Sequence, residues 1–290
     1  MPSKAHVLSR EIEMFLKWWA ATKASGAMEV EAKLNAELSK LFRDLADQVI
    51  EKLGDRLLSP EMQKGPVSTV IDAVREKFQE MIFNYTAEAA QQGAIGASAG
   101  MAVDSSADLG GSLYLQMKER VFAGAESTMD RVKGDVMSSL ADSYDRGLGI
   151  DEAARLLRDN VFDGLKDWEA ERIARTEIHA AAGEGVHQVI DDYGDYRQWL
   201  TAEDDRVRDG SHGDADHESM HGQIVRSGDP YSNGLAYPGD PSGDADEICN
   251  CRCLEVAFEM PEGKTAPEGM DYFYEEDLVD IDLPADAEAA

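Results

Sequence analysis

The residues best suited to binding a metal ion or forming a disulfide are three cysteines near the C-terminal end. Cys249, Cys251 and Cys253 alternate with other residues, so an extended strand would point all three thiols to one face. Neighbouring thiols on such a face lie roughly 6–7 Å apart, which is too far for an unstrained disulfide. An odd number of closely packed cysteines is also unlike a secreted disulfide framework. Packing as free thiols and binding of a metal are the two remaining interpretations.

A structural zinc ion could combine two of these thiols with two histidines. Zinc takes four tetrahedral sulfur or nitrogen ligands, and His217, His221, Cys251 and Cys253 would supply them. Such a site would hold down a long polar loop. However, one residue separates the two cysteines where close zinc ligands usually have two between them, and buried free cysteines are common. The sequence therefore favours packed thiols and no cofactor, with a structural zinc ion as the alternative.

The same histidines form a literal His-Glu-x-x-His pattern at residues 217–221. In zinc proteases this spacing places both imidazoles on one helix face, and the glutamate acts as general base. Here Gly222 follows directly, no apolar periodicity surrounds the motif, and a third ligand would have to come from Asp244, Asp246 or Glu247. A zinc metalloprotease is thus the alternative function, and the main prediction is a protein with no catalytic residues.

The charge of the chain limits its partners. Its 290 residues are enough for one large domain or two ordinary ones, and the hydrophobic fraction of 43% is enough to form a core. The chain has 58 Asp and Glu residues against 28 Lys and Arg residues, which gives a net charge of −30. Such a surface repels phosphates, so we expect contact with DNA to be indirect or local. Because acid is spread along the whole chain, a saline or haloarchaeal host is our hypothesis, in competition with simple solubility.

The sequence shows neither an export signal nor a membrane span. The apolar run at residues 15–19 is broken by Lys17, and no run approaches the roughly eighteen apolar residues that a span needs. We expect a protein made in the host cytoplasm, with no membrane partner.

The first half of the chain is predicted to be a series of helices. Apolar residues recur there at three- and four-residue steps, which is typical of one face of a helix. The stretches are Leu38 to Leu53, Val67 to Tyr85 and Met129 to Tyr144. Gly147 follows as a C-terminal cap. Gly93, Gly96 and Gly100 indicate tight helix crossing, since no phosphate-binding fingerprint surrounds them.

From about Gly149 the pattern changes. We expect helices from Asp151 to Leu157 and from about Asp167 to Tyr193, with Asp151 as N-cap. A strand from Tyr196 to Thr201, a turn-rich loop to about Glu247 and a closing strand from Ile248 to Phe258 would follow. A loop of this length in a compact domain is usually functional or held by side chains.

The predicted fold is therefore mainly α. It has an N-terminal helical portion (1–148), a small α+β domain with a long irregular loop (149–260), and an acidic tail (261–290) that we expect to be flexible.

Four motifs occur in order in the second half. They are Ile173-Ala174-Arg175-Thr176-Glu177 on a helix, Trp199 with Thr201 in a strand, Asp205-Arg206-Val207-Arg208 before a histidine and His221-Gly222-Gln223, and Pro238-Gly239-Asp240-Pro241 before Asn250-Cys251-Arg252-Cys253. Together, over roughly Gly149 to Val256, they resemble the Mu F-like family of phage minor head proteins, whose shared unit is the head morphogenesis domain. The interval after Arg208 is longer than in the family, so the family histidine is His212 or His217; we assign it to His217.

The resemblance implies a structural minor head (minor capsid) protein of a tailed virus, without catalytic activity. Such a protein is present in the virion head or connector, associates with the portal protein and in some cases the major capsid protein, and acts in head assembly and in DNA packaging or ejection. We interpret the motif residues as structural groups that fasten the long loop, with charge-assisted hydrogen bonds from the charged ones and Trp199 as a core anchor. They are Arg175, Thr176, Glu177, Trp199, Asp205, Arg208 and Asn250.

Overall fold

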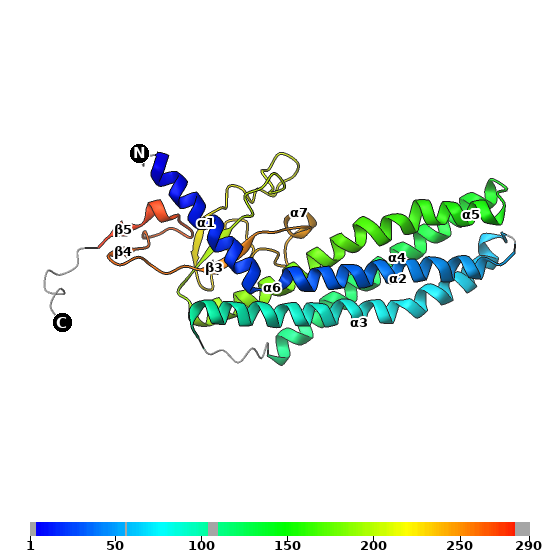
Figure 1. The fold of residues 1–290 in the computed structure, drawn as a ribbon, viewed down its shortest axis with the longest axis horizontal. Helices are drawn as coiled ribbons and strands as arrows, with labels where there is room; N and C mark the ends of the chain where they lie inside the picture. The colour runs from blue at the N-terminus through cyan, green and yellow to red at the C-terminus, as the bar shows by residue number, and fades with distance from the viewer. Residues whose placement is uncertain (1–3, 56, 104–109, 282–290) are drawn as a thin grey trace. The chain divides into compact units, whose positions relative to one another are not determined.

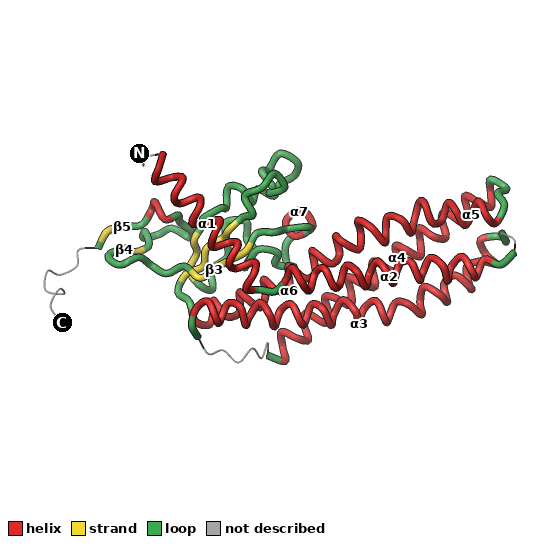
Figure 2. The backbone as a smooth tube through the Cα atoms, viewed as in Figure 1, coloured by secondary structure: helices red, strands yellow, loops and turns green. Residues whose placement is uncertain are grey.

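A computed structural model describes residues 4–55, 57–103 and 110–281. Helices dominate, and a small antiparallel sheet lies in the C-terminal part, as Figures 1 and 2 show. This confirms the predicted fold class, mainly α with a small α+β portion.

The structure divides into two compact units, each assembled from separate segments of the chain. Glu29–Glu88 and Gly110–Ile178 make the helical unit, and Met1–Met28, Ala89–Leu109 and His179–Ala290 make the loop-rich unit. Each unit combines segments that are far apart in the chain, so these units do not test the predicted boundaries at 148/149 and 260/261. That division stays a prediction.

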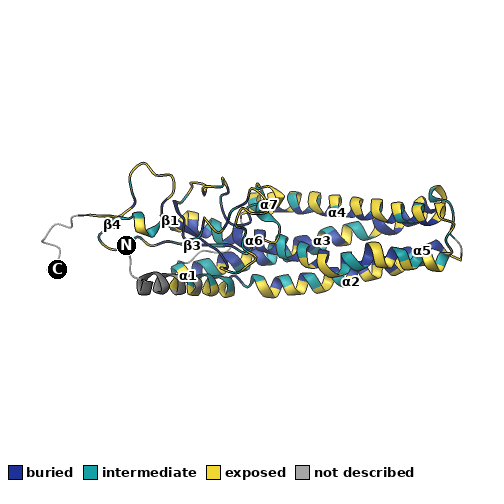
Figure 3. Ribbon diagram, turned by 90° about the horizontal axis from the view of Figure 1, so that it is seen from above, coloured by how far each residue is buried: buried dark blue, intermediate teal, exposed yellow. Residues whose placement is uncertain are grey.

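Long helices build the helical unit. They are α2 (Ala27–Leu53), most of α3 (Pro60–Met101), α4 (Gly111–Asp145), α5 (Ile150–Leu157), π-helical turns at Arg158–Phe162 and Leu165–Glu169, and the start of α6 (Ala170–Tyr193). One face of each is buried, as the dark blue sides in Figure 3 show. On α2 the predicted apolar stripe is wholly buried, and the Phe42 ring packs 5.7 Å from the Phe78 ring of α3. The structure thus confirms the helices that the three- and four-residue spacing of apolar residues predicted.

The end of α4 agrees with the prediction, and the start of α5 differs from it. Gly147 has φ 67 and its N–H bonds the Tyr144 carbonyl at 2.9 Å, so it terminates α4 as expected. The α5 helix is preceded by Gly149, and Asp151 lies inside its first turn without capping it. The predicted N-cap at Asp151 is therefore wrong, because the extended backbone that a cap requires falls two residues earlier.

Close backbone contacts within the loop-rich unit depend on glycine. A Cβ at Gly93 would clash with the Ala182 carbonyl of α6, and one at Gly96 would clash with the Ala24 carbonyl of α1 (Lys4–Ala24). The predicted tight crossing is confirmed at these two positions. At Gly100 the prediction is wrong, since a Cβ there would meet no described atom within 4 Å.

Three short strands form the sheet of the loop-rich unit. Strand β1 (Tyr196–Leu200) is central, with β2 (Ile224–Arg226) and β3 (Leu254–Ala257) antiparallel on either side. The first strand is confirmed. The closing strand is shorter than predicted, because the short helix α7 (Ala245–Ile248) and a turn occupy the residues before it.

Much of the predicted acidic tail packs on this unit. Strands β4 (Lys264–Thr265) and β5 (Val279–Asp280) pair with each other. Buried Phe273 exchanges two backbone hydrogen bonds with Ile224, of 2.7 and 3.0 Å. The segment up to Ile281 thus differs from the expected flexible tail, while residues 282–290 lie outside the described residues.

None of the helices in the described ranges combines the length and the hydropathy needed to cross a bilayer.

Candidate metal centre

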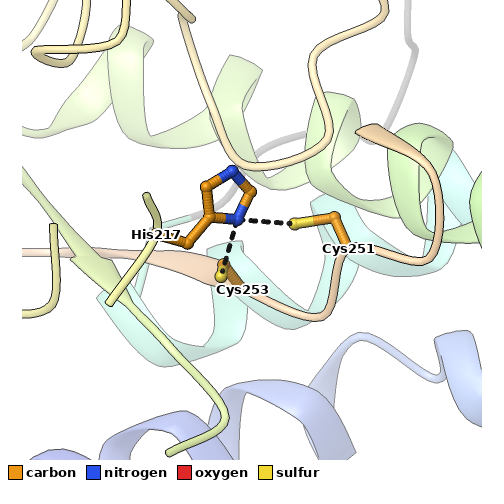
Figure 4. A group of neighbouring side chains, drawn as sticks. All are labelled: His217, Cys251 and Cys253. Atoms are coloured by element: carbon orange, nitrogen blue, oxygen red, sulfur yellow. Dashed lines mark hydrogen bonds between the residues drawn. The ribbon is translucent and has the colours of Figure 1, made fainter. Parts of the chain in front are cut away.

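Three of the four predicted metal ligands come together in the loop-rich unit (Figure 4). The Nδ1 atom of His217 lies 3.7 Å from the Cys251 sulfur and 3.4 Å from the Cys253 sulfur. The three ligand atoms are all within 4.8 Å of one another, and the three residues are buried. Two thiols and an imidazole nitrogen therefore converge on one point.

The fourth predicted ligand, His221, is outside this cluster. Its Nδ1 atom accepts a 3.1 Å hydrogen bond from the Thr201 amide, and its Nε2 atom lies 2.7 Å from a carboxylate oxygen of Glu203. Residues 217–221 form turns with i to i+3 hydrogen bonds, so His217 and His221 do not share a helix face. The structure thus corrects the predicted ligand set. The described residues also do not form the helical arrangement that a His-Glu-x-x-His protease requires.

Local backbone geometry explains why only two of the three cysteines join the cluster. Asn250 has φ 56, a left-handed conformation that asparagine tolerates better than most residues. This turn separates half-buried Cys249 from the extended segment that follows, where Cys251 and Cys253 are buried and Arg252 faces Asp204 instead. The expectation that all three thiols share one face is therefore wrong.

A carboxylate orients the imidazole of His217. Its Nε2 atom lies 2.7 Å from Glu247, which also accepts a 2.9 Å hydrogen bond from the Asn233 side chain. Because Glu247 can only accept when ionised, the proton of a neutral imidazole resides on Nε2 and the Nδ1 lone pair faces the two sulfurs. The ring of Trp199 packs edge-on against the imidazole, 5.2 Å away.

The thiols differ in acidity. Hydrogen bonding from Cys253 lowers the pKa of Cys251 well below its usual range, despite burial, and His179 and His217 add to this effect. Burial raises the pKa of Cys253. Burial also works against protonation of His217, but its bonds to Cys251 and Glu247 outweigh it and raise its pKa. The first proton lost by the pair therefore comes from Cys251.

His179 lies beside this three-residue cluster without belonging to it, and the sequence analysis missed it. It lies on α6, is 9% exposed, and its ring is close enough to the Cys251 thiol to contribute to the lowering of that pKa. Gly239, with φ 86, packs against its ring, and a Cβ there would lie 2.9 Å from the His179 Cδ2 atom. The only signal in the sequence was that a histidine follows the Arg-Thr-Glu motif, two residues after Glu177.

The sequence analysis also missed Arg197, a buried side chain that fastens the long loop. It is 1% exposed in β1 and donates 2.5 Å hydrogen bonds to the carbonyls of Asp229 and Ala236. Its charge is balanced by Glu255 and Asp191, each 3.3 Å away. The signal for a buried charge in the sequence was an arginine inside a short strand that ends in Trp199 and Leu200.

The motif residues separate into two groups. In the loop-rich unit, Trp199 is fully buried and Arg208 donates a hydrogen bond to the Cys249 carbonyl. Asp205 is exposed, and its neighbour Asp204 pairs with Arg252 instead, which holds the pKa of Asp204 far below its usual range.

The other group serves the helical unit. Arg175 pairs with Glu31 of α2 at 3.2 Å and with Glu171 at 2.5 Å. Glu177 faces Arg120 of α4 at 3.9 Å, and burial raises its pKa, while Thr176 between them is half-buried. The interpretation that Arg175 and Glu177 fasten the loop is corrected, because α6 points them at other helices.

These features define a mainly helical protein whose small α+β unit is held by buried polar side chains. Residues 134–256 match the family model for phage Mu protein F like protein, so the predicted resemblance is confirmed over that segment. Neither a comparison with curated proteins nor one with solved structures gave a match. The matched segment includes all four motifs and the cluster residues. The matched model describes a family of structural phage head proteins.

Proposed function

We propose that this chain is a minor head protein of a tailed virus, which associates with the portal protein and acts in head assembly and in DNA packaging or ejection. The observation that carries the proposal is the family match over residues 134–256. The proposed location is the virion head or connector, after synthesis in the host cytoplasm.

The contacts of three arginines in the loop-rich unit support a scaffold. Arg197 and Arg208 donate to carbonyl groups of the chain's own loop, and Arg252 pairs with Asp204. Guanidinium groups with several donors suit this purpose, since one side chain can satisfy several acceptors of an irregular backbone. These polar groups are engaged in holding the fold, which is the use expected in an assembly component.

The charge of the chain bears on its proposed partners. A net charge of −30 opposes binding to DNA phosphates. A role in packaging or ejection would therefore act through the portal protein, or through the major capsid protein, with DNA contact only indirect or local.

Analysis of virus particles tests the proposal. We expect the polypeptide in purified particles, and we expect tagged protein to capture the portal protein of the same virus. Deleting the gene should yield defective heads, and supplying the chain in trans should restore them. Its absence from both immature and mature particles, together with failure to capture the portal protein, would refute this role.

The non-enzymatic part of the proposal has its own test. Glu218 would be the general base of the alternative metalloprotease, and it is exposed in a turn. We expect Glu218→Gln to match the wild type in peptide cleavage and self-processing assays. Cleavage that the wild type performs and the folded variant loses would establish the protease instead.

A further inference from the structure

The cluster around His217 has the dimensions of a tetrahedral metal site. Zinc bonds of about 2.3 Å to sulfur and 2.0–2.1 Å to nitrogen place a sulfur and a nitrogen ligand about 3.6 Å apart at a tetrahedral angle. The observed separations of His217 Nδ1 from the two sulfurs are 3.4 and 3.7 Å. These distances bracket that value.

The surroundings of His217 distinguish a metal ligand from a packed histidine. Histidines that bind metals usually donate their other ring N–H to a carboxylate, which fixes the tautomer and the ring orientation. Glu247 is in that position at 2.7 Å, and Asn233 holds Glu247 in turn. The nitrogen that faces the sulfurs is thus the one with a free lone pair.

A fourth ligand is available from α6. The Nε2 atom of His179 is buried and makes no hydrogen bond of normal geometry to any residue that the structure describes. A buried nitrogen without a partner is costly, and a bond to a metal would satisfy it. The same imidazole adjoins Cys251, one of the two converging thiols.

We infer that His179, His217, Cys251 and Cys253 bind one zinc ion as a structural centre. Two thiolates would neutralise the charge of the ion, and two sulfur and two nitrogen ligands fill a tetrahedral site without an open position for catalysis. This inference does not depend on the proposed role in head assembly.

The ion would join three parts of the loop-rich unit that the sheet does not connect. His179 comes from α6, His217 from the middle of the long loop, and the cysteines from the segment just before β3. Since the sheet has only three strands of three to five residues, a metal cross-link between these parts would add substantially to stability.

Zinc content and coordination of the full chain test the inference. We expect one zinc per chain by elemental analysis of reduced protein. X-ray absorption at the zinc edge should show two sulfur ligands near 2.3 Å and two imidazole nitrogens near 2.0 Å. Cobalt added to the metal-free protein should give the charge-transfer absorption of thiolate ligands. Reduced protein that neither contains zinc nor takes up added zinc or cobalt would overturn the inference.

Matched variants test the ligand set. Affinity is measured by competition between the metal-free protein and a chromophoric chelator for added zinc. We expect Cys251→Ser and Cys253→Ser to abolish stoichiometric binding, whereas Cys249→Ser should bind as the wild type does. His179→Gln should weaken binding at least 100-fold, and the control His221→Gln less than about threefold. If His221→Gln weakens binding and His179→Gln does not, the fourth ligand is assigned wrongly.

The orienting carboxylate provides an independent readout. Glu247→Gln keeps all four ligands and should weaken zinc binding about 10- to 100-fold, as is usual when such a partner is changed. If His179→Gln fails to fold, the absorption spectrum of the wild type still decides the coordination. One nitrogen and three sulfur ligands, or a shell without sulfur, would contradict the four residues proposed.

Discussion

In the helical unit, backbone hydrogen bonds are made within each helix and the buried side chains are mainly apolar. In the loop-rich unit, the chain between β1 and β3 has little regular structure, and its buried polar side chains bind carbonyls and carboxylates far away in sequence. Those buried in the helical unit are Gln63, Thr86, Ser143 and Glu169; those in the loop-rich unit include His179, Arg197, Gln198, Thr201, His217, Gln223 and Glu255.

This difference shows where each unit is sensitive to substitution. Local hydrogen bonds survive the loss of a side chain, so a helix suffers mainly through the cavity that is left. An irregular loop depends on single polar groups, whose loss leaves several buried partners unsatisfied. Amide hydrogen exchange resolves the two units, since it reports the free energy of opening segment by segment.

The largest effect is expected for Arg197→Met in the loop-rich unit. This change leaves Glu255 and Asp191 without their buried counter-charge and frees two loop carbonyls. Breaking a buried ion pair costs about 3–5 kcal/mol. Exchange should accelerate strongly in residues 227–240 and in β1. Arg226→Gln, an exposed arginine of the same sheet, is the control and should change the unfolding free energy by less than about 0.5 kcal/mol.

Leu38→Ala should have the next largest effect, confined to the helical unit. Leu38 is fully buried on α2, and such truncations cost about 3 kcal/mol. Chemical denaturation gives the loss of stability, and exchange should rise in α2 and the helices around it. The exposed neighbour Glu37→Ala serves as control. If amide exchange accelerated equally in the loop at residues 201–253, the two units would not be stabilised independently.

Arg208→Gln and Arg175→Gln form a pair that separates the motif arginines. Loss of the bond from Arg208 to the Cys249 carbonyl should cost about 2 kcal/mol, because the donor is charged and half-buried. Arg175 pairs with Glu31 and Glu171 between helices, so its loss should cost about 1 kcal/mol or less. Exchange should report the first change only in the loop and the second only in the helices; the reverse result would restore the idea that Arg175 fastens the loop.

The smallest effect is expected for Asp204→Asn, and it depends on pH. Hydrogen bonds from Arg252 lower the pKa of Asp204 in the folded protein. The carboxylate therefore stabilises the fold above its unfolded pKa of about 4, and this contribution is lost as the pH falls toward the lowered value. At pH 7 the variant should be less stable by about 0.5–1 kcal/mol. Thermal unfolding should show that difference narrowing below pH ~4, and a difference that widens in acid would disprove the assignment.

The accuracy of the sequence predictions follows the same division. Helices α2, α3 and α4 were predictable because apolar spacing is a local signal, and Gly147 because a helix end needs a left-handed residue. The cluster was only partly predictable. Spacing along the chain suggested His221 as a ligand, but a turn directs it toward Thr201 and Glu203.

The sequence by itself determined the helices, the strand around Trp199 and the family to which residues 134–256 are similar, since these depend on local periodicity and on ordered motifs. Only the tertiary structure decided which side chains meet. In the structure, His179 of α6 lies beside the thiol of Cys251. Cys251 and Cys253, but not Cys249, lie next to His217. Arg197 hydrogen-bonds the carbonyls of the loop. Those choices depend on contacts between residues far apart in the chain, which are set by the packing of whole elements and leave no regular spacing in the sequence.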